Sequence, residues 1–436
     1  MVEITNNYEV YKDSGVEWLG QIPEHWEISK FKRLFVEKKK TTNVELNCGS
    51  ISFGKIVYKD DERIPESTKR SYQVLSKGDF LINPLNLNYD LISLRIALSE
   101  IDVVVSSGYI ILNNRVKLDK NYYKWLLHIF DVVFMKTLGA GVRQTLSFTH
   151  LANCELVYPP LREQIVIATF LDDKTAKIEQ AIAIKEQQIA MLKERKQIII
   201  QEAVTKGLDK TVKLKDSGVE WIGMIPEHWE VKRLKNLIQN LESGVSVNAS
   251  ESESAKEHEI GVLKTSAVYK YSFDKSENKK VFINDINRVS CPVRKGRIII
   301  SRMNAPDLVG ASGFVHEDYP NLYLPDRLWQ TVFNPAIEFY SYWLSLILIN
   351  KSFRTIVTSL ANGSSPSMKN ISKPDYLNIY IPFPNFHEQY QIASHIDSQS
   401  SKIDQAVSIK EQEIEKLKEY RMSLIDTVVT GKVKVC

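Results

Sequence analysis

One segment of the chain occurs twice, and this repeat constrains the possible folds more than any other feature of the sequence. Residues 12–34 read KDSGVEWLGQIPEHWEISKFKRL, and residues 215–237 read KDSGVEWIGMIPEHWEVKRLKNL. Weaker similarity extends through each copy, so that the segment from Glu163-Gln164 onward matches the segment from Glu388-Gln389 onward. A period of roughly 210 residues is far too long for a stacked-repeat protein. The sequence therefore predicts two copies of one unit, related by a pseudo-two-fold axis.

Each copy is expected to have three parts. The first is the lead-in, residues 12–34 or 215–237, whose Pro, Gly and Trp content indicates an ordered turn region. A mixed region with strand signals and one helix follows, and a long helix that begins after a proline ends the copy. We expect strands at residues 101–105, 109–112 and 297–300, shorter helices at residues 122–135 and 339–349, and glycine-containing loops at residues 139–145 and 362–367.

The long segments 161–205 and 386–430 contain neither Gly nor Pro. Apolar or small residues recur in them at spacings of three and four, which predicts a coiled-coil seam. The seam residues are Ile165, Ala168, Thr175, Ile178, Ile182, Ile189, Leu192, Ile199 and Ala203, then Ala393, Ile403, Val407, Ile414, Leu417, Leu424 and Val428. Lys185 and Lys410 interrupt the seam at matching positions, as register-setting polar residues do. The charged outer faces favour a coiled coil over two helices buried in a core.

The expected fold class is α+β: two mixed α/β domains separated by two long antiparallel coiled-coil helices, each roughly 60–65 Å long at 1.5 Å per residue. The domains are expected at residues 1–158 and 209–383, each with its lead-in, and the helical spacers at residues 159–208 and 384–436. Hydrophobic residues make up 43% of the chain and charged residues 25%, as in ordinary globular proteins.

Several kinds of catalytic site are disfavoured because their motifs are missing. The chain has no phosphate loop, no dinucleotide-binding glycine motif and no zinc-ligand cluster, and its four cysteines lie far apart. The segment Asn83-Pro84-Leu85-Asn86 resembles an amino-methyltransferase motif but lacks the second proline and the aromatic residue. His25 and His228 recur in the lead-ins without a second ligand nearby, so we expect them to pack beside Trp26 and Trp229. No metal site is expected, and the N-terminal residues show no secretion signal.

Net charge is only +4, so a role with nucleic acid would need local basic patches or a partner that shares the phosphate contacts. Polar and basic side chains do occur at loop positions in both copies, and Arg, Asn and Gln can pair with base edges while Lys, Ser and Tyr suit phosphates. In the first copy the candidates are Lys55, Asn83, Asn86, Asn88, Tyr89, Ser106, Ser107, Arg143 and Gln144. In the second copy they are Lys264, Ser266, Tyr269, Arg302, Asn304, Arg327, Ser364, Ser365 and Lys369. The alternative for any one of them is an ordinary solvated loop.

The two KDSGVEW(L/I)GxIPEHWE lead-ins, the Pro-Pro-Leu-Arg-Glu163-Gln164 start of the first long helix and the matching Glu388-Gln389 resemble the specificity subunits of type I restriction–modification systems. The second helix departs from the family pattern, since it opens with Pro384-Asn385-Phe386 instead of a double proline. The resemblance covers essentially the whole chain. It implies that each mixed region is a target-recognition domain for one half of a split, asymmetric DNA site, and that the helices space the halves.

The resemblance also implies partners. The helices would dock two DNA-methylating modification subunits, and ATP-dependent restriction subunits would join them to cut DNA. S-adenosylmethionine, ATP and magnesium would then belong to the partner subunits, no cofactor would bind this non-catalytic chain, and no membrane would be involved. We expect a reducing, cytoplasmic location. Three other interpretations stay open: a methylation-only complex, a protein-binding scaffold with two domains on a coiled coil, and, least favoured, a stand-alone methyltransferase.

Overall fold

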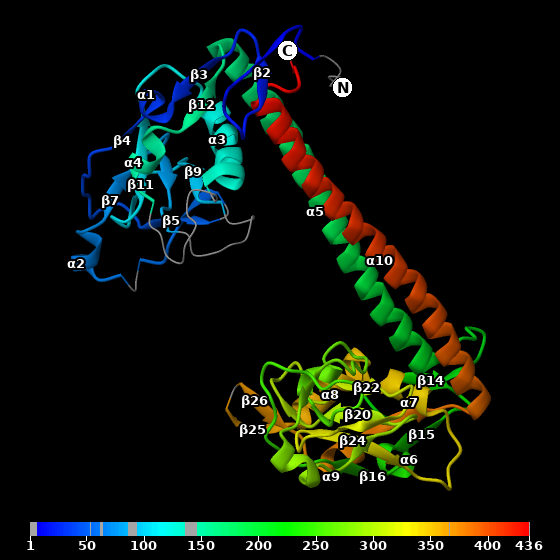
Figure 1. Ribbon diagram of the computed structural model, residues 1–436. Helices are drawn as coiled ribbons and strands as arrows, with labels where there is room; N and C mark the ends of the chain where they lie inside the picture. The colour runs from blue at the N-terminus through cyan, green and yellow to red at the C-terminus, as the bar shows by residue number, and fades with distance from the viewer. Residues whose placement is uncertain are drawn as a thin grey trace. The chain divides into compact units, whose positions relative to one another are not determined.

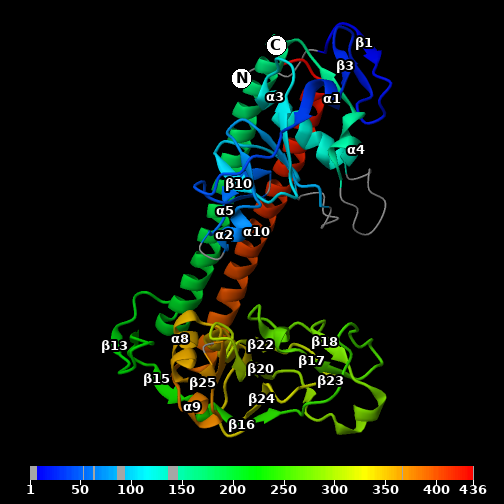
Figure 2. The ribbon, with the colours of Figure 1, turned by 90° about the vertical axis from the view of Figure 1, so that its left-hand side faces the viewer.

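The computed structural model describes residues 7–52, 54–61, 64–85, 94–135, 146–365 and 367–435. The chain divides into two compact units, the first formed by Met1–Lys185 with Glu411–Cys436 and the second by Glu186–Lys410. Two long helices, α5 (Leu161–Lys206) and α10 (Phe386–Val429), each contribute a segment to both units. Figures 1 and 2 show α5 and α10 side by side.

The first unit is built around a four-stranded antiparallel sheet of order β4-β11-β8-β9. Its helices, apart from the exposed α2 (Glu66–Lys69), share one hydrophobic core with this sheet and with the first turns of α5. The strands are β1 (Tyr11–Asp13), β2 (Gln21–Pro23), β3 (Glu27–Lys30), β4 (Phe35–Glu37), β5 (Gly49–Ser52), β6 (Lys55–Tyr58), β7 (Gln73–Leu75), β8 (Phe80–Ile82), β9 (Ile96–Leu98), β10 (Val103–Val105), β11 (Ile110–Asn114) and β12 (Glu155–Tyr158). The helices are α1 (Phe31–Leu34), α2 (Glu66–Lys69), α3 (Lys120–Ile129), the π-helix η1 (Phe130–Met135) and α4 (Phe148–Ala152).

The second unit has an equivalent antiparallel sheet of order β16-β24-β20-β22, and a further sheet of order β18-β17-β23-β19. The strands are β13 (Leu214–Asp216), β14 (Met224–Pro226), β15 (Glu230–Arg233), β16 (Ile238–Ser243), β17 (Gly261–Leu263), β18 (Asn278–Lys280), β19 (Pro292–Val293), β20 (Ile298–Ser301), β21 (Met303–Asn304), β22 (Ser312–Phe314), β23 (Tyr319–Tyr323), β24 (Leu328–Phe333), β25 (Asn362–Ser365), β26 (Met368–Asn370) and β27 (Tyr380–Phe383). The helices are α6 (Leu234–Leu237), η2 (Thr265–Val268), η3 (Ile283–Arg288), α7 (Ser341–Leu348), α8 (Lys351–Leu360) and α9 (Lys373–Leu377).

The two lead-ins fold in the same way. Each forms a short antiparallel hairpin, β1–β2 in the first unit and β13–β14 in the second. The strand that follows pairs with the strand just before the long helix, β3 with β12 and β15 with β27. Trp26 and Trp229 are fully buried at equivalent places. The predicted duplication and the mixed α/β content of each copy are therefore confirmed.

The segments of α5 and α10 run antiparallel within each unit, as their ion pairs show. In the first unit Lys185 bonds Glu413 at 2.6 Å and Arg421 lies 3.4 Å from Glu179. In the second unit Lys410 bonds Gln188 at 2.7 Å and Lys196 lies 2.7 Å from Asp404. The repeat makes these contacts equivalent in pairs: Lys185–Glu413 corresponds to Lys410–Gln188, and Arg421–Glu179 to Lys196–Asp404. α5 and α10 therefore pair in the same register in both units.

Three local predictions need correction. Ile165 is 48% exposed and does not belong to the seam, because the first turns of α5 bury Ile167 and Leu171 in the core of the mixed region instead. Residues 362–367 are not simply a loop, since β25 pairs with β26 there. The α-helix expected at residues 122–135 ends at Ile129, and its continuation is the π-helix η1.

Candidate nucleic-acid interface

A carboxylate at the start of each long helix holds the lead-in in place. Glu163 accepts hydrogen bonds from the Trp26 indole at 3.0 Å and the Tyr8 hydroxyl at 3.0 Å, and lies 2.6 Å from His25. Burial would raise the pKa of Glu163, but the hydrogen bonds from Trp26, His25 and Tyr8 outweigh it and hold that pKa below its usual value. The sequence placed His25 beside Trp26 and missed the carboxylate that contacts both.

The second unit repeats this arrangement. Glu388 accepts from the Trp229 indole at 3.3 Å and lies 2.9 Å from His228. The signal that could have revealed it is the recurrence of His, Trp and Glu at equivalent positions in both copies. Each histidine contacts a carboxylate at the start of a long helix, and so helps to attach the lead-in to that helix.

The glutamine that follows each carboxylate ties the mixed region to the same helix. The Gln164 side chain accepts from the backbone N–H of Asp119 at 2.8 Å and donates to the Pro159 carbonyl at 2.8 Å. Gln389 accepts from the backbone N–H of Tyr340 at 2.7 Å and donates to the Pro384 carbonyl at 2.9 Å. Both glutamines are fully buried. The Glu-Gln pair is therefore a frame that fixes lead-in, mixed region and long helix together in each unit.

Four of the nine candidates of the first unit are among the residues that the structure describes. Lys55 is exposed at the start of β6, and Ser106 and Ser107 are exposed in the β10–β11 connection. Asn83 follows β8, and its side-chain oxygen accepts from the backbone N–H of Leu85 at 3.1 Å. The remaining candidates lie outside the described residues: Asn86, Asn88, Tyr89, Arg143 and Gln144. As DNA contacts, all of these residues stay predictions.

A buried ion pair missed by the sequence lies between two of these candidate segments. The Arg95 guanidinium bonds Asp131 at 2.9 Å, and Asp131 also accepts from the Arg95 backbone N–H at 2.5 Å. The two side chains are 7% and 0% exposed. Arg95 comes shortly after the segment of Asn86, Asn88 and Tyr89, and Asp131 lies in η1, shortly before the segment of Arg143 and Gln144. A π-helix is a rare element that often marks a functional site.

In the second unit five candidates gather around β21, and we call them the β21 cluster. The Asn304 amide donates to the Tyr269 hydroxyl at 2.8 Å, Asn304 pairs across the sheet with Lys369, and the Arg302 backbone N–H bonds the Arg327 carbonyl at 3.1 Å. Arg327 is exposed, and the buried Nε of Arg302 has no partner among the described residues. Ser364 and Ser365 belong to β25 of the same sheet. The sheet β21-β26-β25 thus brings cationic and amide side chains together.

Lys264 and Ser266 are less available than the sequence suggested. The Ser266 hydroxyl donates to Glu277 at 2.5 Å, and the Lys264 ammonium lies 3.7 Å from the same carboxylate. Glu277 would partly neutralise Lys264 and would repel a phosphate. Their place in a DNA interface is therefore weaker than that of the β21 cluster.

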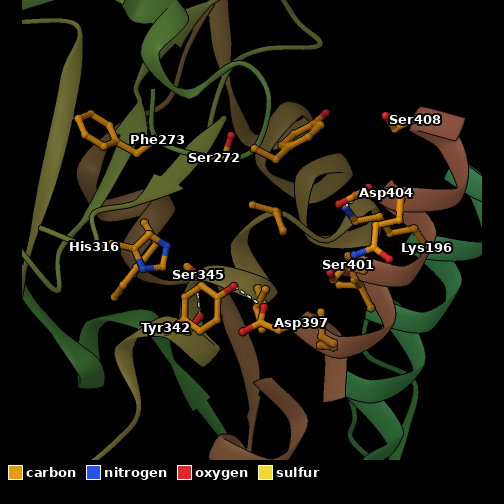
Figure 3. Close-up of a pocket in the computed structure, with 18 residues that line it drawn as sticks. Lys196, Ser272, Phe273, His316, Tyr342, Ser345, Asp397, Ser401, Asp404 and Ser408 are labelled. Atoms are coloured by element: carbon orange, nitrogen blue, oxygen red, sulfur yellow. Dashed lines mark hydrogen bonds and ion pairs between the residues drawn. The ribbon is translucent and has the colours of Figure 1, made fainter. Parts of the chain in front are cut away.

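A cavity of about 630 Å³ lies beside the helix pair inside the second unit. Figure 3 shows Phe273, His316 and Tyr342 of the mixed region on one side and Ser401, Asp404 and Ser408 of α10 on the other. The Tyr342 hydroxyl bonds Asp397 at 2.5 Å, and at the equivalent position of α5 Asp172 forms a 3.0 Å ion pair with Lys124. Burial, and then the Asp397 carboxylate, raise the pKa of Tyr342. Asp397 and Asp404 line this cavity, and its lysine, Lys196, is already paired with Asp404 at 2.7 Å, so little positive charge is left for a phosphate.

Among the residues that the structure describes, no group of three or more His, Cys, Asp or Glu side chains is placed to hold a metal ion. Within the same residues, no helix combines the length and the apolar character that crossing a membrane requires.

Comparisons with known proteins agree with the sequence resemblance. The profile of the type I restriction modification DNA specificity domain matches residues 23–193 and 226–419. The MjaVIII type I restriction enzyme specificity subunit of Methanocaldococcus jannaschii is 25% identical over 95% of this chain and 94% of that protein. The putative MjaX specificity subunit of the same organism is 24% identical over 96% of each chain. A solved chain from a study of complex assembly and conformational transition of the type I R-M system has a TM-score of 0.66 at 13% identity, covering 94% of this chain and 98% of the other, and so shares its fold.

Proposed function

Because the chain belongs to the type I restriction–modification DNA specificity family, we propose that it reads a bipartite, asymmetric DNA site, one half with each unit. The observation that carries this proposal is the repeated frame. Glu163 and Gln164 in one unit, and Glu388 and Gln389 in the other, fix two mixed regions on long helices by equivalent bonds. Two regions that are attached to the helices by equivalent bonds but differ in their surface residues suit the reading of two different half-sites.

The second unit supports the proposal with its surface chemistry. The β21 cluster offers Arg302, Arg327 and Asn304, side chains that can contact base edges by two hydrogen bonds, together with Lys369 for phosphates. Asn304 and Lys369 come from segments far apart in the sequence and pair across the three-stranded sheet β21-β26-β25, and Arg302 immediately precedes β21. The first half-site would be read by the candidates of the first unit, including Arg143 and Gln144.

The long helices would set the distance between the half-sites. α5 and α10 hold the same antiparallel register in each unit through equivalent ion pairs. A helix advances 1.5 Å per residue, so helices of 46 and 44 residues are about 66–69 Å long, which is close to two turns of DNA at about 34 Å each. We therefore assign them the role of a spacer.

The same helices would dock the modification subunits. Apolar side chains are exposed at equivalent positions, Ile184 at 48% and Ile409 at 56%, and likewise Ile165 at 48% and Tyr390 at 56%. Exposed apolar groups at matching positions of the two copies suit two copies of the same partner. Restriction subunits would then join the complex, which would work in the cytoplasm, the compartment that holds the DNA.

We propose that this chain performs no catalysis, and that S-adenosylmethionine, ATP and magnesium act in the partner subunits. The damaged Asn83-Pro84-Leu85-Asn86 motif supports this assignment. The purified chain should transfer no methyl group from S-adenosylmethionine to DNA, whereas the complex with its modification subunits should. Transfer by the isolated chain would overturn the assignment.

The decisive experiment exchanges one recognition region. Residues 35–158 are replaced by the equivalent region of a relative, and the methylated motif is mapped in cells that carry the hybrid and its modification subunits. We expect one half of the motif to change and the other half to stay. The equivalent exchange of residues 238–383 is the matched control and should change the opposite half. If the chain were instead a protein-binding scaffold, neither exchange would alter a DNA motif, and DNA binding would show no steep dependence on salt.

A further inference from the structure

A second cavity in the second unit, of about 730 Å³, borders the β21 cluster. One side is the face of α8 that carries Lys351, Arg354, Thr355 and Thr358, at helical spacings that bring their side chains together. Tyr271 and Asp307 come from two other segments, and Lys369 comes from β26. We call this cavity the Arg354 pocket. Lys369 lines it and also belongs to the β21 cluster, so the two are continuous.

The lining of the Arg354 pocket is cationic. Lys351, Arg354 and Lys369 carry positive charge, and Asp307 is the acid among the lining residues. Lys351 is exposed and makes no ion pair with a described residue. Lys369 donates a long bond of 3.3 Å to the Ala361 carbonyl. The excess of positive charge favours an anion.

Arg354 supplies the observation that points to a ligand. The residue is only 7% exposed, and its Nε and Nη1 are buried without a partner among the described residues, while Nη2 donates to the Asp307 carbonyl at 2.8 Å. The guanidinium faces the Tyr271 ring, 5.8 Å from its centroid, and Tyr271 holds a left-handed φ of 57°. Burial lowers the pKa of Arg354, and the neighbouring Tyr271, Tyr376 and Asp307 offset this only in part. Unpaired buried donors are costly, and an acceptor oxygen would relieve that cost.

The hydroxyl groups in the pocket narrow the choice of ligand. Thr355 donates to the Lys351 carbonyl at 3.0 Å, and Thr358 donates to the Pro306 carbonyl at 3.1 Å. Their hydrogens are already used, so they offer little to an anion. The cationic donors that line the pocket are Arg354 and the ammonium groups of Lys351 and Lys369. A guanidinium flanked by ammonium groups matches a phosphate with several acceptor oxygens.

We propose that the Arg354 pocket binds one backbone phosphodiester of the DNA next to the second half-site, with Arg354 and Lys351 as donors and Lys369 as the link to the β21 cluster. This inference rests on the proposed function. A phosphate held here fixes the register of the duplex and leaves base discrimination to Arg302, Asn304 and Arg327.

The test measures duplex binding by the full chain assembled with its modification subunits. Lys351→Gln is the main variant, because Lys351 is exposed and its loss should not impair folding. Arg354→Gln is the second variant, checked for folding by its melting temperature. Lys295→Gln is the matched control, an exposed lysine of the same unit outside the pocket. Each protein is titrated at several salt concentrations with a target duplex and an unrelated duplex.

Loss of one phosphate contact should weaken binding of both duplexes by the same factor, about fivefold to tenfold for Lys351→Gln. The slope of the logarithm of the binding constant against the logarithm of the salt concentration should become shallower by about 0.9. Lys295→Gln should bind like the unchanged protein. A second measurement replaces single phosphates of the duplex by neutral methylphosphonates. At one position beside the second half-site, this replacement should weaken binding by the unchanged protein. The same replacement should not weaken binding by Lys351→Gln any further.

Two outcomes would overturn the proposal. One is a Lys351→Gln protein with unchanged affinity, slope and methylphosphonate profile. The other is tight binding of inorganic phosphate at constant ionic strength that Arg354→Gln abolishes, without any effect of either variant on the duplex, which would mark a site for free anions. Failure of the proposed function would look different, because the unchanged complex would then show no preference for its target duplex.

Discussion

Arg95 and Asp131 form an ion pair that is almost completely withdrawn from solvent, with Nε 2.9 Å from Oδ1. Removing one partner leaves an uncompensated buried charge, which costs roughly 3–5 kcal/mol. Arg95→Met should therefore lower the free energy of unfolding by about that amount, as measured by denaturant titration. The double variant Arg95→Met, Asp131→Leu should recover most of the loss. Equal losses in both proteins would show that the charges are not coupled.

The same pair also predicts an effect on specificity. In the sequence, Arg95 closely follows the segment of Asn86, Asn88 and Tyr89, and Asp131 closely precedes the segment of Arg143 and Gln144, so the double variant should relax the first half of the methylated motif. The second half should stay unchanged, since Arg95 and Asp131 belong to the first unit. Motif mapping in cells measures both halves at once. A change in the second half would contradict the assignment.

Arg143 and Gln144 give a direct test of base reading in the first unit. Changing either to Ala should weaken binding of the first half-site by about 1–3 kcal/mol and broaden the bases accepted there. Competition between duplexes that differ in one base pair measures this. An equal loss on every sequence would identify a phosphate contact, and no loss would return the residue to an ordinary solvated loop.

The Glu163 carboxylate should make the stability of the first unit depend on pH. Its folded-state pKa lies below the usual value, so its stabilisation is complete above the unfolded pKa of about 4.3 and is lost as pH falls through the folded pKa. Glu163→Gln should lower the free energy of unfolding by about 1–2 kcal/mol at neutral pH. In acid the free energies of unfolding of the variant and the unchanged protein should become equal. Glu179→Gln is the control: this residue forms an exposed 3.4 Å ion pair and should cost under about 0.5 kcal/mol.

The paired contacts on the helices predict a stabilising change. Lys185 has a glutamate partner in the first unit, whereas its equivalent Lys410 bonds the amide of Gln188. Gln188→Glu should complete the missing ion pair and raise the free energy of unfolding by about 0.2–1 kcal/mol at low salt, with the gain shrinking at high salt. Gln187→Glu adds the same charge at an exposed neighbouring position and should give no such gain.

The spacer role can be tested by length. Four residues inserted after Lys185 add about 6 Å along the helix axis, close to one or two base pairs at about 3.4 Å each. The unread spacer of the methylated motif should grow by roughly that amount, and both half-sites should stay. Some loss of affinity is expected because four residues exceed one helical turn by about 40°. The same insertion after Lys210, in the connector beyond α5, should leave the spacer unchanged. An unchanged spacer in both proteins would refute the role.

The sequence predicted those features that are local or repeated. Proline and the absence of Gly fixed the long helices within a residue or two, and α5 begins at Leu161 as expected. β-Branched runs located β10, β11 and β20. Contacts between distant segments could not be read in this way. Glu163 meets His25 across 138 residues and Asp131 meets Arg95 across 36, and no periodicity carries such pairings.

The candidate site shows the same division. Composition and loop position selected Asn304 and Lys369 but could not show that they face each other across β21 and β26. They also selected Lys264, without revealing that Glu277 lies beside it. Arg354 was missed because nothing local marks an arginine whose nitrogens are buried by other segments.

The frame glutamines bind main-chain groups in the mixed regions, and this has a consequence for how such proteins diversify. Gln164 bonds the backbone N–H of Asp119, and Gln389 bonds the backbone N–H of Tyr340. Asp119 and Tyr340 thus make the same main-chain hydrogen bond although their side chains differ. Substitutions in a recognition region therefore leave its attachment to the long helix intact, because that attachment uses main-chain groups. One copy of the duplicated unit can thus change its target sequence and still stay fixed to the helices.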